Sequence, residues 1–109
     1  MLSVPFFSIH HIHEQVAEDA SHAIRLINRA HTNLNHAQPQ LQAFRAVGDT
    51  PTIAPKGLLS GVSVSVKDLY AATGFDTYAG SPLALTEFNM SGTLVKRLTD
   101  AGAHICGKT

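Results

Sequence analysis

LLSGVSVSVKDLY, residues 58–70, alternates valine with small polar residues and then delivers a lysine. Successive side chains of a β-strand point to opposite faces, so this stretch predicts a strand with one apolar and one polar face. The apolar face consists of Val62, Val64 and Val66. The opposite face consists of Ser63, Ser65 and Lys67. Lys67 falls at the C-terminal end of the strand, which is where ligand crevices form in open α/β sheets.

A lysine at the end of a strand has a simpler interpretation. Such residues commonly stay in solvent and prevent edge-to-edge pairing of sheets. Lysine is also almost never fully buried unless it is paired. On this pattern alone we favour a solvated Lys67, and the rest of the chain has to decide whether the residue has a chemical role.

Composition limits the function classes. The chain has 109 residues, enough for one small domain, and its eight basic residues balance eight acidic ones. This balance gives no basic surface for nucleic acid and no polybasic membrane patch. The single Cys106 excludes an internal disulfide framework and fits a reducing compartment. No apolar run is long enough to span a bilayer, and the N-terminus lacks the basic region of a signal peptide. We therefore expect a cytoplasmic protein without nucleic-acid or membrane partners, whose oligomeric state the sequence leaves open.

The N-terminal segment has helical periodicity. Apolar residues recur at a spacing of three or four, which predicts one long amphipathic helix from about Ile9 to Asn35. Ser8 is the expected N-cap, and Asn35 and Pro39 are expected to mark the end. The apolar stripe comprises Ile9, Ile12, Val16, Ala20, Ala23, Ile27, Ala30 and Leu34.

Six of the seven histidines lie in this segment. His10 and His13 are three residues apart, a spacing that lets two side chains share one helix face and bind a metal. Neither has a third ligand or a carboxylate partner in register, so we favour exposed polar positions. We expect no metal and no other cofactor.

The segment after the helix is less regular. Leu41 to Val47 predicts either a short strand or the start of another helix, and residues 48–57 form a Pro- and Gly-rich loop. Ala71 to Ser91 is expected to be mostly irregular, and a loop of this length in a compact domain is usually functional or disordered.

A helix and a strand follow. Thr93 to Ala101 predicts a short helix, capped by Ser91 or Thr93, with Gly102 as a left-handed C-cap. Ala103 to Cys106 predicts a buried strand. Strand, loop, helix and strand make a crossover unit, so the two strands should be parallel neighbours. Parallel strands are normally covered on both faces, and two helices are too few to do this, so the sheet is expected to be incomplete.

The ordered set of motifs resembles the amidase signature family of serine hydrolases. The matching residues are Leu59, Gly61, Val62, Val64, Val66, Lys67, Asp68, Gly74, Ala79, Gly80, Ser81, the helix from Leu94 to Leu98, Ala101, Gly102, Ala103, Gly107, Lys108 and Thr109. The resemblance implies an α/β fold, a mixed sheet flanked by helices, of which this chain holds the N-terminal part. Residues 1–109 would form a partial amidase domain, with residues 1–38 as its helical segment and residues 58–109 as the start of the signature core. The loop between Val47 and Leu58 is shorter than is usual in the family.

The resemblance also implies a chemistry. Family members cleave or transfer amides with a nucleophilic serine, a second serine in a cis peptide bond, and a lysine that acts as base. Lys67 matches the catalytic lysine, whereas Lys108 matches the lysine of a Gly-Lys-Thr turn that we interpret as structural. The family's serine-bearing segment follows the position of Thr109. We therefore expect the N-terminal part of an amide hydrolase, inactive by itself, whose full-length form acts on a small-molecule amide.

Two other interpretations remain open. The chain is either a non-catalytic remnant or small interaction module derived from an amidase, or a histidine-based metal binder. A metal titration distinguishes the second of these.

Overall fold

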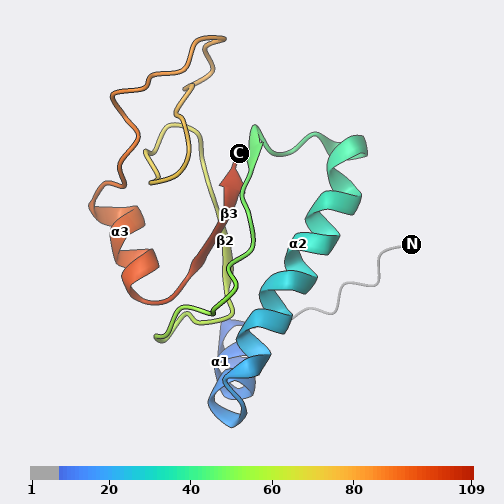
Figure 1. Cartoon of the computed structure of the whole chain (residues 1–109). Helices are drawn as coiled ribbons and strands as arrows, with labels where there is room; N and C mark the ends of the chain where they lie inside the picture. The colour runs from blue at the N-terminus through green and yellow to red at the C-terminus, as the bar shows by residue number, and fades with distance from the viewer. Residues whose placement is uncertain (1–7) are drawn as a thin grey trace.

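The computed structural model describes residues 8–109, which form a small mixed α/β unit (Figure 1). Its elements follow the chain in the order α1, α2, β1, β2, α3, β3. The helices are α1 (Ile9–Glu18), α2 (Ser21–Leu41) and α3 (Thr93–Asp100). The strands are β1 (Ala46–Val47), β2 (Ser63–Val66) and β3 (His104–Lys108). The predicted α/β class is therefore confirmed.

β3 lies at the centre of a three-stranded sheet of order β1-β3-β2. β2 pairs with it in parallel and β1 antiparallel, so the predicted crossover unit is confirmed. Val66 of β2 is opposite Lys108 of β3, and the register shifts between Val64 and Ser65. Because β1 runs the other way, its start lies at the same sheet edge as the carboxyl ends of β2 and β3.

α2 and α3 lie on opposite sides of the sheet (Figure 1). The core beneath α3 joins the two strands, the helix and the loop, and it consists of Val66, Ala72 and Val95 with Phe75 and Ile105 packed against them. On the other side Ala23 and Ile27 of α2 are fully buried. A Cβ at Gly61 would lie 3.1 Å from Val16 and 3.4 Å from Ala23, so a glycine lets the helices approach the strand.

The prediction of one long N-terminal helix is wrong, because the segment forms two helices. Asp19 is extended, with φ −150° and ψ 114°, and interrupts the helical backbone. Its carboxylate Oδ1 accepts a hydrogen bond from the Ser21 N–H at 2.9 Å, which satisfies a free donor at the start of α2. The predicted N-cap of α1 is confirmed, since the Ser8 side chain accepts from the His11 N–H.

The predicted end of this segment is also wrong. α2 continues past Asn35 and through Pro39 to Leu41. The side chain of Gln38 exchanges two hydrogen bonds with the backbone of Phe44, and Gln42 adopts a left-handed C-cap. These interactions end the helix later than proline alone would suggest. Of the two alternatives for Leu41 to Val47, the strand is realised only at its last two residues.

The short helix α3 starts at the expected residue but without the expected cap. Its N-cap is Gly92, which has no side-chain hydrogen bond to offer. Ser91 instead accepts from the Thr73 N–H at 2.9 Å and so ties the helix start to the loop. Gly102 has φ +96°, which confirms the predicted left-handed glycine after the helix. Residues 71–91 contain only isolated bridges, as expected.

None of the helices within residues 8–109 has both the length and the apolar character needed to cross a bilayer.

Candidate functional site

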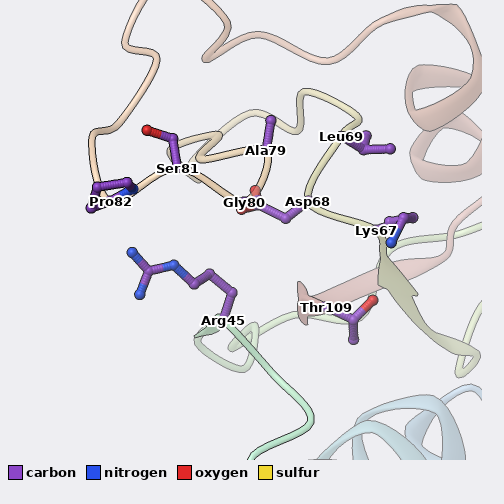
Figure 2. A pocket seen from close by; sticks show the side chains of 9 residues that line it. All are labelled: Arg45, Lys67, Asp68, Leu69, Ala79, Gly80, Ser81, Pro82 and Thr109. Atoms are coloured by element: carbon purple, nitrogen blue, oxygen red, sulfur yellow. The ribbon is translucent and has the colours of Figure 1, made fainter.

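A pocket of about 650 Å³ opens where the carboxyl ends of β2 and β3 meet the start of β1 (Figure 2). The residues that follow β2 line one side together with Thr109, which follows β3, and the long loop forms the opposite wall. The lining residues are Arg45, Lys67, Asp68, Leu69, Ala79, Gly80, Ser81, Pro82 and Thr109. This is the sheet edge at which the sequence predicted a site.

Lys67 follows β2 directly and lines the pocket, as Figure 2 shows. Its side chain is exposed and forms no ion pair with any of residues 8–109. Two hydrogen bonds continue the ladder beside it: the Thr109 N–H donates to the Val66 carbonyl at 2.8 Å, and the Asp68 N–H donates to the Thr109 carbonyl at 2.7 Å. The backbone on both sides of Lys67 is thus fixed while its amine stays accessible.

The neighbouring Lys108 has the opposite environment. It is fully buried, and its Nζ donates to Oδ1 of Asp68 at 2.9 Å. Longer contacts reach the Thr77 hydroxyl at 3.3 Å and the Asp76 carbonyl at 3.4 Å. A buried ammonium needs such partners because leaving water is costly for a charge. This arrangement fits the structural role expected for Lys108, but the residue lies in β3 and not in the turn that the sequence predicted.

The Asp68 carboxylate joins β2, β3 and the long loop. Besides the bond from Lys108, the carboxylate accepts a hydrogen bond from the Tyr78 N–H at 3.1 Å. The backbone carbonyl of Asp68 accepts one from the Ala79 N–H at 3.0 Å. Burial raises the pKa of Asp68, but the hydrogen bonds from Lys108 and Tyr78 outweigh it, so the pKa is lowered overall. The carboxylate therefore stays charged near neutral pH and holds the loop against the sheet.

The loop forms the far wall of the pocket with a tight turn. Ala79 and Gly80 both have positive φ, +52° and +80°, and the Ser81 N–H donates to the Tyr78 carbonyl at 2.9 Å. This is the geometry of a turn that favours glycine. The Ser81 hydroxyl accepts from the Leu83 N–H at 3.1 Å, so it is engaged in local structure.

Arg45 closes the pocket from the β1 side. Its backbone N–H donates to the Lys108 carbonyl at 2.7 Å, and its guanidinium carbon lies 3.9 Å from the centre of the Tyr78 ring. Stacking on an aromatic ring orients a guanidinium without occupying its N–H donors.

The other residues singled out in the sequence lie elsewhere. Ser63 and Ser65 lie in β2, directly before Lys67, but neither lines the pocket. His10 lies on the exposed face of α1, as expected, but it does have a carboxylate partner, because it pairs with Glu14 at 3.0 Å. Within residues 8–109 no three His, Cys, Asp or Glu side chains gather closely enough to hold a metal.

Sequence reasoning missed two features of this site. The pairing of Asp68 with Lys108 joins residues forty positions apart, and a lysine at the end of an apolar strand was its only signal. The position of Arg45 depends on the antiparallel pairing of a two-residue strand, for which the sequence carries no distinct pattern.

Comparison with known proteins defines the class. The family model for Amidase matches residues 13–109, and the chain belongs to this family. It is 32% identical, over an alignment 117 positions long, to the A subunit of the glutamyl-tRNA(Gln) amidotransferase of Trichodesmium erythraeum, and the match covers 94% of this chain and 24% of that protein. It is 33% identical, over an alignment 99 positions long, to an amidase of Pseudomonas putida, with 80% of this chain and 21% of that protein covered. The expected amidase resemblance is thereby confirmed.

A crystal structure shows the same fold. The corresponding glutamyl-tRNA(Gln) amidotransferase protein of Thermotoga maritima superposes with a TM-score of 0.80 at 23% identity, over 99% of this chain and 24% of that chain. The chain thus spans about a quarter of the length of the relatives it matches.

Proposed function

We propose that this chain supplies the lysine base of an amide-hydrolysing enzyme, and that Lys67 is this residue. The observation that carries the proposal is the contrast between two lysines at one sheet edge. Lys108 is buried and committed to Asp68, whereas Lys67 is accessible in the pocket. Family membership supports amide chemistry as the class of reaction.

The mechanism follows from the resemblance to amidase signature enzymes. A neutral Lys67 takes a proton from a bridging serine, which takes the proton of a second, nucleophilic serine. The nucleophile then attacks the amide carbonyl, the C–N bond breaks, and the amine leaves with a proton returned along the same path. Water hydrolyses the resulting ester. Both serines are assigned to residues outside this sequence, so we expect the chain to be inactive by itself.

A lysine base has to be neutral, and burial is the usual way to disfavour its charged form. Lys67 is exposed within residues 8–109. We therefore propose that the Lys67 amine is buried in the working enzyme by bound substrate or by polypeptide outside the described residues.

The test measures turnover of a simple aliphatic amide by the intact natural protein. Lys67→Arg keeps the positive charge, but a guanidinium stays protonated and cannot act as base. We expect a loss of about a thousandfold or more in kcat, since general-base catalysis contributes roughly 10²–10⁴-fold and activates the nucleophile. Lys96→Arg on α3 is the matched control, because Lys96 pairs with Asp100 in solvent. Near-normal turnover of Lys67→Arg would overturn the assignment.

A further inference from the structure

The side chains that line the pocket leave an excess of positive charge. Arg45 and Lys67 are its two cations, and Asp68 is its one carboxylate. The charge of Asp68 is already balanced by Lys108 at 2.9 Å. Neither Arg45 nor Lys67 forms an ion pair with any of residues 8–109. A concave site with two uncompensated cations attracts an anionic ligand.

Arg45 is also held in place. The Tyr78 ring supports one face of the guanidinium, and the backbone N–H of Arg45 is fixed on the Lys108 carbonyl. Figure 2 shows the guanidinium extending toward the Pro82 side of the pocket, with Lys67 on the opposite side near Thr109. An oriented guanidinium presents forked donors that match a carboxylate, and less conformational freedom is lost on binding.

We propose that Arg45 binds a carboxylate of the substrate, so that the pocket accepts amides that carry an anionic group at the end away from the scissile bond. This inference rests on the proposed function, because Lys67 marks the end where the amide reacts. The two cations have separate tasks: a base is neutral when it acts, whereas a guanidinium keeps its charge at every working pH. Arg45 is therefore the residue suited to hold the anion.

Binding tests this without any need for turnover. Levulinate has the shape of a carboxylated amide, but a methyl ketone replaces the amide, so it is not hydrolysed. 5-Methylhexan-2-one, in which an isopropyl group replaces the carboxylate, is its neutral counterpart and has no amide or ester bond to hydrolyse. Ligand-observed NMR titration of the intact natural protein measures the affinity of each. We expect levulinate to bind about tenfold more tightly than the neutral ketone, as one charge-assisted pair would give.

Three variants assign the preference to Arg45. Arg45→Gln should abolish the preference by weakening the binding of levulinate about tenfold and leaving the binding of the neutral ketone unchanged. Arg45→Lys keeps the charge without the fork and should retain part of the preference. Arg97→Gln removes the same charge from α3, outside the pocket, and should leave the preference intact. Circular dichroism checks that each variant is folded.

The proposal is overturned if the natural protein binds levulinate and the neutral ketone equally, or if Arg45→Gln keeps the preference. A loss of preference in Arg97→Gln as large as in Arg45→Gln would also overturn it, because general surface charge would then suffice. These results are distinct from failure of the proposed function, which shows as retained turnover in Lys67→Arg. A levulinate preference that depends on Arg45 would stand even in that case.

Discussion

Lys67 and Lys108 end neighbouring parallel strands, yet their environments are opposite. Val66, the last residue of β2, is opposite Lys108 in the register, so Lys67 lies one residue beyond the end of β2. This offset leaves Lys67 exposed in the pocket and brings Asp68 within 2.9 Å of the buried Lys108 amine. The comparison teaches that pairing across the sheet, and not position at a strand end, distinguishes the two lysines: the Asp68 carboxylate is adjacent to Lys67 in the sequence but pairs with Lys108.

The largest expected effect concerns the buried pair. Lys108→Met removes the partner of Asp68 and leaves a buried carboxylate uncompensated, which should lower the free energy of unfolding by about 3–5 kcal/mol. Lys67→Met, the matched control, should change it by no more than about 0.5 kcal/mol. Urea unfolding of the intact natural protein measures both. Equal effects of the two substitutions would remove the structural distinction between the lysines.

A double substitution sharpens the same comparison. Adding Asp68→Asn to Lys108→Met removes the unpaired charge, so the pair should cost less than the sum of the single changes. We expect a coupling of roughly 1–3 kcal/mol, as is usual for residues in direct contact. Lys67→Met combined with Asp68→Asn should be additive. Additivity at Lys108 would show that the two buried groups act independently.

Gly102 and Gly74 separate backbone strain from close packing. Both have positive φ, +96° and +92°, so valine at either should cost about 1–2 kcal/mol. A Cβ at Gly102 would also lie 2.8 Å from the Lys56 carbonyl oxygen, whereas a Cβ at Gly74 meets nothing within 4 Å. Gly102→Val should therefore destabilise more than Gly74→Val in thermal melts. Equal losses would mean that the contact with Lys56 relaxes freely.

The smallest expected effect is the pH dependence linked to His104. Burial lowers its pKa, and the charge of His31 on α2 lowers it further. Below about pH 6.5 the unfolded chain gains a proton that the folded chain resists, so stability falls as pH drops from there through the folded pKa. His104→Gln should flatten the fall measured between about pH 7.5 and 5. His36→Gln serves as control, because His36 is not among the groups that lower the pKa of His104; a slope unchanged in His104→Gln would contradict this linkage.

The sequence was most informative where local chemistry decides the structure. Alternating valines predicted β2, the positive φ of Gly102 followed from its place after a helix, and the crossover predicted parallel β2 and β3. Prediction from the sequence failed where a single side chain outweighed the helical spacing of apolar residues. Asp19 interrupts the predicted helix and accepts a hydrogen bond from the Ser21 N–H. α2 continues through Pro39 to Leu41, and the Gln38 side chain donates to the Phe44 carbonyl just beyond its end.

The candidate site was only partly predictable for a related reason. Lys67 could be found because it ends the polar face of the predicted strand and because it matches the family's lysine. Arg45, Tyr78 and Asp68 come together through pairings between distant segments, and no local pattern encodes such contacts. The role of Lys67 itself stays a prediction.

The most direct measurement is amide turnover and unfolding free energy, determined together for Lys67→Met and Lys108→Met in the intact natural protein. The account predicts that Lys67→Met loses turnover at nearly unchanged stability, whereas Lys108→Met loses stability first. Normal turnover in a stably folded Lys67→Met protein would contradict the assignment of Lys67 as the base.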